Sequence, residues 1–161
     1  MQSLSRLKES PSQTAGPYVH IGCMPNFCDI KGVYPEDPGS TMVNSLTRGE
    51  RISVTGIVYD GTGTPLKDAM IEIWQADADG LYPSPEEHRG TADPNFTGWG
   101  RKASDYATGE WVFETNANDP ILTRMEQQNR VQTLIARKTG DGSYRFDIYL
   151  QGEKETVFFD F

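Results

Sequence analysis

One stretch of the sequence, from Val54 to Tyr82, constrains the fold more than any other part of the chain. It begins within a run, Ile52 to Tyr59, that is rich in β-branched and aromatic residues, which favour a half-buried strand. Residues 60–65 contain Gly, Asp and Pro, which tolerate positive φ or fix φ, so the chain must reverse there. Residues 69–74 then alternate between two faces. This pattern predicts two strands joined by a turn, with later strands added to the same sheet.

The rest of the chain predicts an all-β protein. The segment 1–48 is rich in Pro, Gly, Asn and Asp and predicts an arm and irregular loops, while 49–161 predicts an antiparallel β-sandwich, so 1–161 forms a single domain. One short helix is predicted after Asp119-Pro120, an acidic N-cap followed by proline. Further short strands are predicted at residues 99–103, 110–115, 133–138, 144–150 and 155–161.

The overall charge excludes one class of partner. The chain has 161 residues and a net charge of −8, whereas phosphate binding requires a basic surface, so nucleic acid is not expected as a partner. The first ten residues carry charges without an apolar core, and no apolar run is long enough to span a membrane, so a cytoplasmic protein is expected. Cys23 and Cys28 are expected to be reduced thiols.

Several motifs resemble those of the intradiol ring-cleavage dioxygenases. They comprise the Gly and Val pattern of 54–58, the sequence IEIWQADADGLY at 71–82, the arm at 10–22, DPNFTGWGR at 93–101 and the tail at 144–161. Together they cover nearly the whole chain and are similar to the alpha chains of two-chain family members that act on protocatechuate. The resemblance implies a transthyretin-like β-sandwich, a partner beta chain, and cleavage of protocatechuate by O2 to 3-carboxy-cis,cis-muconate.

The resemblance also implies a non-haem Fe(III) ion held by two tyrosines and two histidines. This chain has only His20, in the arm, and His88, in an acidic loop, and neither belongs to a His-x-His strand pair. The seven tyrosines cannot replace the missing histidine pair. We therefore expect no metal ligand and no catalytic residue in this chain, in agreement with the implied arrangement in which the beta chain carries the iron.

Three residues are candidates for the substrate pocket. In the family, the alpha chain helps to close the pocket of its neighbour through the N-terminal arm, which implies roles for Thr14 and Tyr18. Their hydroxyls could bind a substrate carboxylate or line its entry, although Tyr18 could instead pack at the subunit interface. Arg101 is a weaker candidate for steering the carboxylate, and its alternative is an ordinary surface arginine.

The sequence departs from the family pattern after Thr115. A turn and two further core strands are expected there, but Thr115 is followed directly by Asn116-Ala117-Asn118-Asp119-Pro120. Loss of two strands would expose core faces and strand edges. A segment lost from the sequence and a natural deletion both explain this departure. In a continuous chain the Cα atoms of Thr115 and Asn116 lie about 3.8 Å apart, and a larger separation would indicate missing residues.

Two other functions are compatible with parts of the sequence. A transthyretin-like sandwich that binds a ligand or a partner protein, without catalysis, would also account for the stretch 54–82. A self-sufficient iron dioxygenase would require both histidines and the tyrosines in the segment that is absent after Thr115.

Overall fold

The computed structural model describes residues 16, 18–116 and 131–156. The regular secondary structure of the described part is almost wholly β, which confirms the all-β prediction. The predicted helix after Asp119 and most of the predicted strand at 155–161 lie outside the described residues, as does Thr14. The elements are α1 (Tyr18–Cys23), β1 (Arg51–Tyr59), β2 (Met70–Trp74), β3 (Trp99–Ala103), β4 (Glu110–Asn116), η1 (Val131–Leu134), β5 (Arg137–Gly140), β6 (Ser143–Arg145) and β7 (Ile148–Tyr149).

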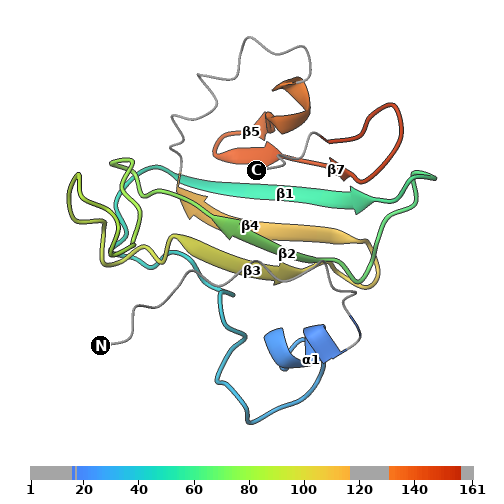
Figure 1. The fold of residues 1–161 in the computed structure, drawn as a ribbon, viewed down its shortest axis with the longest axis horizontal. Coiled ribbons are helices and arrows are strands. Elements are labelled where there is room, and N and C mark those ends of the chain that lie inside the picture. Colours follow the sequence, from blue (N-terminus) through green and yellow to red (C-terminus); the bar gives the residue numbers. More distant parts are fainter. Residues whose placement is uncertain (1–15, 17, 117–130, 157–161) are drawn as a thin grey trace, which may run out of the picture.

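The strands form two sheets (Figure 1). The larger sheet has the order β4-β1-β6-β5, and β7 also pairs with β1. The smaller sheet contains β2 and β3. The prediction that the later strands join the sheet of β1 is therefore wrong for β2 and β3. The turn at 60–65 does close against β1 through the bridge from Tyr59 to Pro65, and the chain then crosses to the second sheet.

The antiparallel prediction holds for β1 with β4, β2 with β3 and β5 with β6, but it is wrong for β1 with β6 and β7, which pair in parallel. The predicted strand at 144–150 is broken at Phe146 and Asp147. There the Asp147 carboxylate, rather than a backbone carbonyl, accepts the N–H of Ile57 at 3.0 Å. A side chain has thus replaced one backbone acceptor in the hydrogen bonding between the strands, and the predicted strand is divided into β6 and β7.

The strand predicted at 133–138 begins later than expected. Residues 131–134 form the 3₁₀ helix η1, and the strand β5 starts only at Arg137. Elsewhere the predicted bounds agree closely with the structure, with β3 at 99–103 and β4 extending one residue beyond the predicted 110–115. The register of β4 on β1 runs without interruption from Thr115, opposite Ile52, to Asn116, opposite Arg51.

The hydrophobic core lies between the two sheets. Its buried members come from both sheets and from the loops at their ends, namely Met42, Val58, Ile71, Phe96, Trp111 and Phe113. Gly100 of β3 faces Phe113 and Met42 so closely that a Cβ there would lie 2.6 Å from the Met42 sulfur. The core therefore packs β3 directly over β4.

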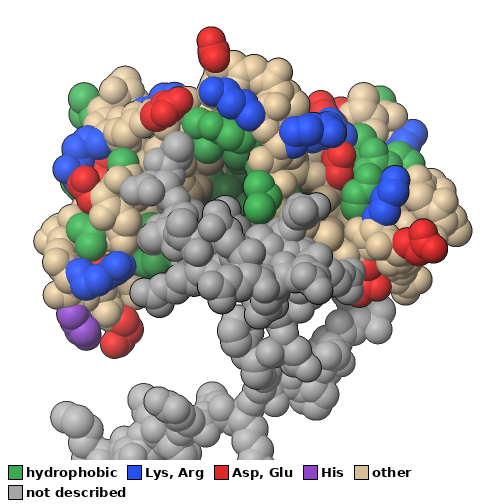
Figure 2. All heavy atoms as spheres, turned by 90° about the horizontal axis from the view of Figure 1, so that it is seen from above, with side chains coloured by type: hydrophobic (Ala, Val, Ile, Leu, Met, Phe, Trp, Pro, Cys, Tyr) green, Lys and Arg blue, Asp and Glu red, His purple; other side chains and the backbone are tan. Residues whose placement is uncertain are grey.

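The surface shows no concentration of positive charge on the face in Figure 2, where basic and acidic side chains are interspersed. None of the described helices has the length and apolar character needed to cross a membrane.

Candidate functional site

Arg101 joins the arm to the smaller sheet. Its guanidinium donates from Nε to the Glu72 carboxylate at 2.7 Å and from Nη1 to the backbone carbonyl of Cys23, the last residue of α1, at 3.2 Å. It also lies over the ring of Trp99, 4.9 Å from the ring centre. The side chain is only 17% exposed, so it is neither an ordinary surface arginine nor directed freely into solvent. Through its guanidinium, Arg101 thus joins α1, at Cys23, to Glu72 of β2.

Tyr18 starts α1 and is the candidate that the structure leaves accessible. Its side chain is 81% exposed, and α1 lies on the β3 side of the molecule, remote from β5 and β7 (Figure 1). The bond from Arg101 to Cys23 fixes the other end of the same short helix. The structure thus links two of the three sequence candidates through one helix, while Thr14 falls outside the described residues.

An Arg101→Lys substitution is expected to lower the free energy of unfolding by about 2 kcal/mol, because lysine keeps the charge but cannot bind Glu72 and the Cys23 carbonyl together. Urea denaturation measures this loss, and limited proteolysis should show faster cleavage near α1. Arg137→Lys is the control, since Arg137 is an exposed residue of β5. Unchanged stability combined with weaker substrate binding in an assembled enzyme would instead support carboxylate steering by Arg101.

The described residues do not fit the iron site of the family. No group of three or more His, Cys, Asp or Glu side chains that could hold a metal occurs in the described part of the chain. The His88 side chain is 81% exposed and lies 4.0 Å from Glu86. His20 lies in α1 with its Nε2 atom buried and without a hydrogen-bond partner among the described groups. No metal-dependent step can be derived from these residues.

A second organised region is the loop cluster around two buried aspartates. Asp77 is 1% exposed, and its carboxylate accepts the N–H groups of Asp79 and Leu81 at 2.9 Å and of Asp93 at 2.7 Å. Asp93 in turn accepts the N–H of Arg48 at 2.8 Å. This bond and the N–H of Asn95 lower the pKa of Asp93. The two carboxylates therefore join three loops through their backbones.

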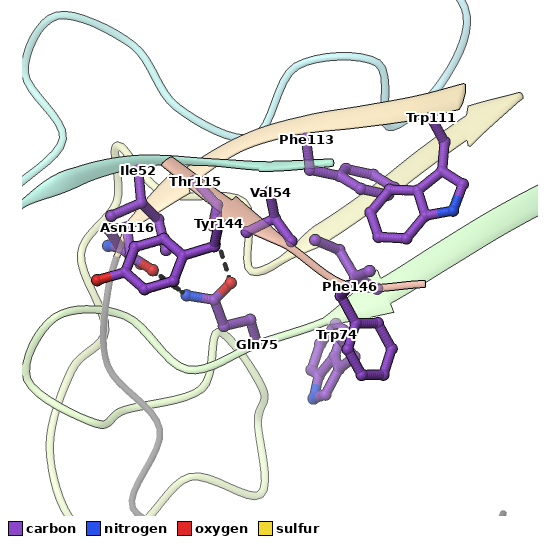
Figure 3. A pocket seen from close by; sticks show the side chains of 11 residues that line it. Ile52, Val54, Trp74, Gln75, Trp111, Phe113, Thr115, Asn116, Tyr144 and Phe146 are labelled. Atoms are coloured by element: carbon purple, nitrogen blue, oxygen red, sulfur yellow. Dashed lines mark hydrogen bonds between the residues drawn. The ribbon is translucent and has the colours of Figure 1, made fainter. Parts of the chain in front are cut away.

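An apolar cleft of about 450 Å³ opens between the two sheets (Figure 3). Its apolar lining comes from β1, β2, β4, β6 and the residue that follows β6, and consists of Ile52, Val54, Ile73, Trp74, Trp111, Phe113, Tyr144 and Phe146. The polar side chains at one end of the cleft bond to one another: Gln75 donates to Asn116 and accepts from the Thr115 hydroxyl at 2.8 Å. The cleft thus presents apolar side chains with few free polar groups.

Sequence reasoning did not identify an aromatic pair that includes Trp74 of the cleft lining. Trp74 is 56% exposed and stacks on Tyr82, with ring centres 6.0 Å apart. Both residues belong to the 71–82 motif that carries the family resemblance. The alternation of 69–74 put Trp74 on the face opposite Ile71 and Ile73, and this was the available signal for Trp74.

Comparison with known proteins establishes the family. The family model described as Dioxygenase matches residues 25–151. The chain belongs to the intradiol dioxygenase family. Over 205 aligned positions it is 35% identical to the protocatechuate 3,4-dioxygenase alpha chain of Pseudomonas putida, with 96% of this chain and 98% of the relative covered.

Two further relatives extend this result. The protocatechuate 3,4-dioxygenase alpha chain of Burkholderia cepacia is 29% identical over 203 positions, with 98% of this chain and 100% of the relative covered. The beta chain from the same organism is 46% identical, but only over 73 residues, or 45% of this chain and 31% of the relative. This family member is therefore similar to alpha chains along nearly its whole length and to a beta chain over less than half of it.

Proposed function

We propose that this chain is the alpha subunit of a protocatechuate 3,4-dioxygenase, contains no iron itself, and acts with an iron-bearing beta chain. The assembled enzyme would cleave protocatechuate with O2 to 3-carboxy-cis,cis-muconate. The observation that carries the proposal is the similarity to alpha chains over 96% and 98% of the chain. The two histidines, which lie apart in α1 and in an exposed loop, support the assignment of Fe(III) to the partner.

In this proposal the chain contributes to binding rather than to bond cleavage. The hydroxyl of Tyr18 is available at the exposed start of α1, and Thr14 precedes it in the same arm. Both hydroxyls would donate to the substrate carboxylate in the beta chain's pocket. Arg101 would act as a positioning residue, since it fixes α1 through the Cys23 carbonyl. The complete domain would have a transthyretin-like sandwich fold.

Iron content and visible absorbance test the assignment directly. Purified alone, the chain is expected to be colourless and free of iron, whereas co-expression with the beta chain should give a red-brown complex that contains both chains and cleaves protocatechuate. The colour would arise from tyrosinate bound to Fe(III) in the partner. Stoichiometric iron on this chain alone would contradict the proposal and favour a self-sufficient dioxygenase.

The apolar cleft favours the second candidate, a sandwich that binds a ligand or a partner without catalysis. This candidate predicts that co-expression with the beta chain yields two separate proteins and no iron complex containing this chain. The same co-expression experiment therefore separates the two candidates.

The arm hydroxyls are tested in the assembled enzyme. Tyr18→Phe and Thr14→Ala are each expected to raise KM for protocatechuate roughly tenfold with little effect on assembly, because a hydrogen bond to a charged group contributes about 1.5 kcal/mol or more. Tyr106→Phe is the matched control, since Tyr106 is also exposed and its ring stacks on Phe27. Unchanged KM in both arm variants would rule out this role for the hydroxyls.

A further inference from the structure

Among the described residues, the strand β2 has one paired edge and one open edge. Toward β3, the carbonyl of Ala69 accepts from Ser104 at 2.8 Å and the N–H of Gln75 donates to Gly98 at 2.7 Å. By strand alternation, the backbone N–H and C=O groups of Ile71 and Ile73 also point toward β3. The N–H of Arg101, opposite Glu72, points away from β2 and donates to Gly39 at 2.8 Å.

It follows that the backbone groups of Met70, Glu72 and Trp74 point away from β3. Within residues 18–116 and 131–156, β3 is the only strand that pairs with β2. A row of unpaired N–H and C=O groups at a strand edge is a template for another strand. The open edge of β2 is therefore able to bind an extended backbone.

The apolar cleft is adjacent to this edge. It extends from Ile73 and Trp74 of β2 to Tyr144 of β6 and the adjoining Phe146 (Figure 3). Core residues of β2 pack with core residues of β4 and β1, and among the described strands only β3 pairs with β2. A third strand placed beside β2 would therefore direct every second side chain into the cleft.

We propose that the open edge of β2 and the cleft accept an extended segment of a different polypeptide, which adds a third strand to the β2–β3 sheet. The alignment with the Pseudomonas putida alpha chain has 205 positions, more than the 161 residues of this chain, so that relative contains residues with no counterpart here. A strand from another molecule would cover the apolar cleft that the described residues of this shorter chain leave open.

Charge indicates the chemistry of the incoming segment. Glu72 is on the outer face of β2, half exposed, and bonded to Arg101 through one carboxylate oxygen, Oε1. The complementary segment would have apolar residues at alternate positions, for the cleft, and a Lys or Arg on the outer face opposite Glu72. A second copy of this chain is disfavoured, because antiparallel pairing of two β2 strands centred on Glu72 would place two carboxylates directly opposite each other.

The test uses the full chain and a synthetic peptide of about seven residues that alternates valine and threonine, with a lysine in place of the central threonine. In the free chain, the amides of Met70, Glu72 and Trp74 are expected to exchange with solvent faster than those of Ile71 and Ile73. Saturating peptide should slow their exchange by roughly tenfold or more. A control peptide N-methylated at the positions that donate to β2 should not bind.

A pair of variants separates strand addition from simple adsorption to the cleft. Met70→Pro removes an N–H from the open edge, where proline is tolerated, and should abolish peptide binding. Met70→Thr keeps that N–H and should retain binding. Equal binding by both variants, or by the N-methylated peptide, would overturn the proposal even if Met70→Pro lowers stability.

Three other results would also overturn it. Slow exchange at Met70, Glu72 and Trp74 in the dilute chain alone would mean that the chain covers its own edge. Protection that increases with protein concentration, together with a dimer mass, would make a second copy the occupant. Rapid exchange of these amides without any binding of the peptide would mean that the open edge does not accept a strand of this chemistry.

Discussion

A Gly56→Ala substitution is expected to destabilise the protein by about 4 kcal/mol, because overpacking and the loss of buried hydrogen bonds act together. A Cβ at this position would lie 1.9 Å from the backbone oxygen of Phe146 and 2.4 Å from Cζ2 of Trp111. The Phe146 carbonyl cannot move away easily, since the N–H of the same residue donates to Thr55 at 2.7 Å. The added methyl group therefore forces β1 and β6 apart.

Urea denaturation followed by circular dichroism measures this effect. A loss of this size is a large fraction of the roughly 5 to 15 kcal/mol that stabilises a typical domain. Gly22→Ala is the control, because nothing lies within 4 Å of the Cβ position at Gly22 in α1. Equal stability of the two variants would show that β1 and β6 do not approach as closely as described.

The second large effect is expected at Asp77. Asp77→Ala removes the acceptor of three backbone N–H groups at a site that is 1% exposed, and should cost about 4 kcal/mol. Asp77→Asn should cost less, about 2 kcal/mol, because one amide oxygen can still accept from Asp79 and Leu81 while the NH₂ group faces the N–H of Asp93.

The same turn supplies a matched control for this series. Asp79→Asn changes a carboxylate whose described side-chain contact is an exposed ion pair with Arg48, at 2.9 Å. Such a pair contributes less than about 1 kcal/mol, so a small change in the free energy of unfolding is expected. Similar losses for Asp77→Asn and Asp79→Asn would mean that net charge, rather than the hydrogen bonds to Asp77, stabilises the loops.

The sequence predicted the strands best where local pattern and burial agree. β1, β3 and β4 were placed within one or two residues, and in β4 the predicted alternation corresponds to alternating buried and exposed side chains. The pairing could not be predicted in the same way. Whether β2 continues the sheet of β1 or crosses to the other layer depends on which partner buries Ile71, and this is a property of tertiary packing.

The break between β6 and β7 illustrates a second limit. The predicted strand at 144–150 has a suitable pattern, yet the carboxylate of Asp147 takes the place of a backbone acceptor for Ile57. A side chain that substitutes for a ladder bond cannot be recognised without knowing which strand lies beside it. The same limit applied to η1, where apolar residues suited a strand but the local turn was helical.

The candidate site was predicted unevenly for similar reasons. Thr14 and Tyr18 were identified from the family resemblance, with Arg101 as a weaker candidate, and the structure shows that Tyr18 and Arg101 are connected through α1. Sequence alone could not show that Glu72, Cys23 and Trp99 surround Arg101, because these residues come from separate segments. Whether the residues of the arm contact substrate remains a prediction for the assembled enzyme.

The parallel pairing of β1 with β6 and β7 has a consequence for how the protein is made. The residues joined across this seam, such as Ile57 and Asp147, lie 90 positions apart. Contacts of such long sequence separation form slowly, because the entropy of closing the intervening loop opposes them. During synthesis, β1 and β4 leave the ribosome well before β6 does. The apolar faces of β1 and β4 therefore stay uncovered until β6 has been synthesised. During this time the chain is most prone to aggregate or to bind chaperones.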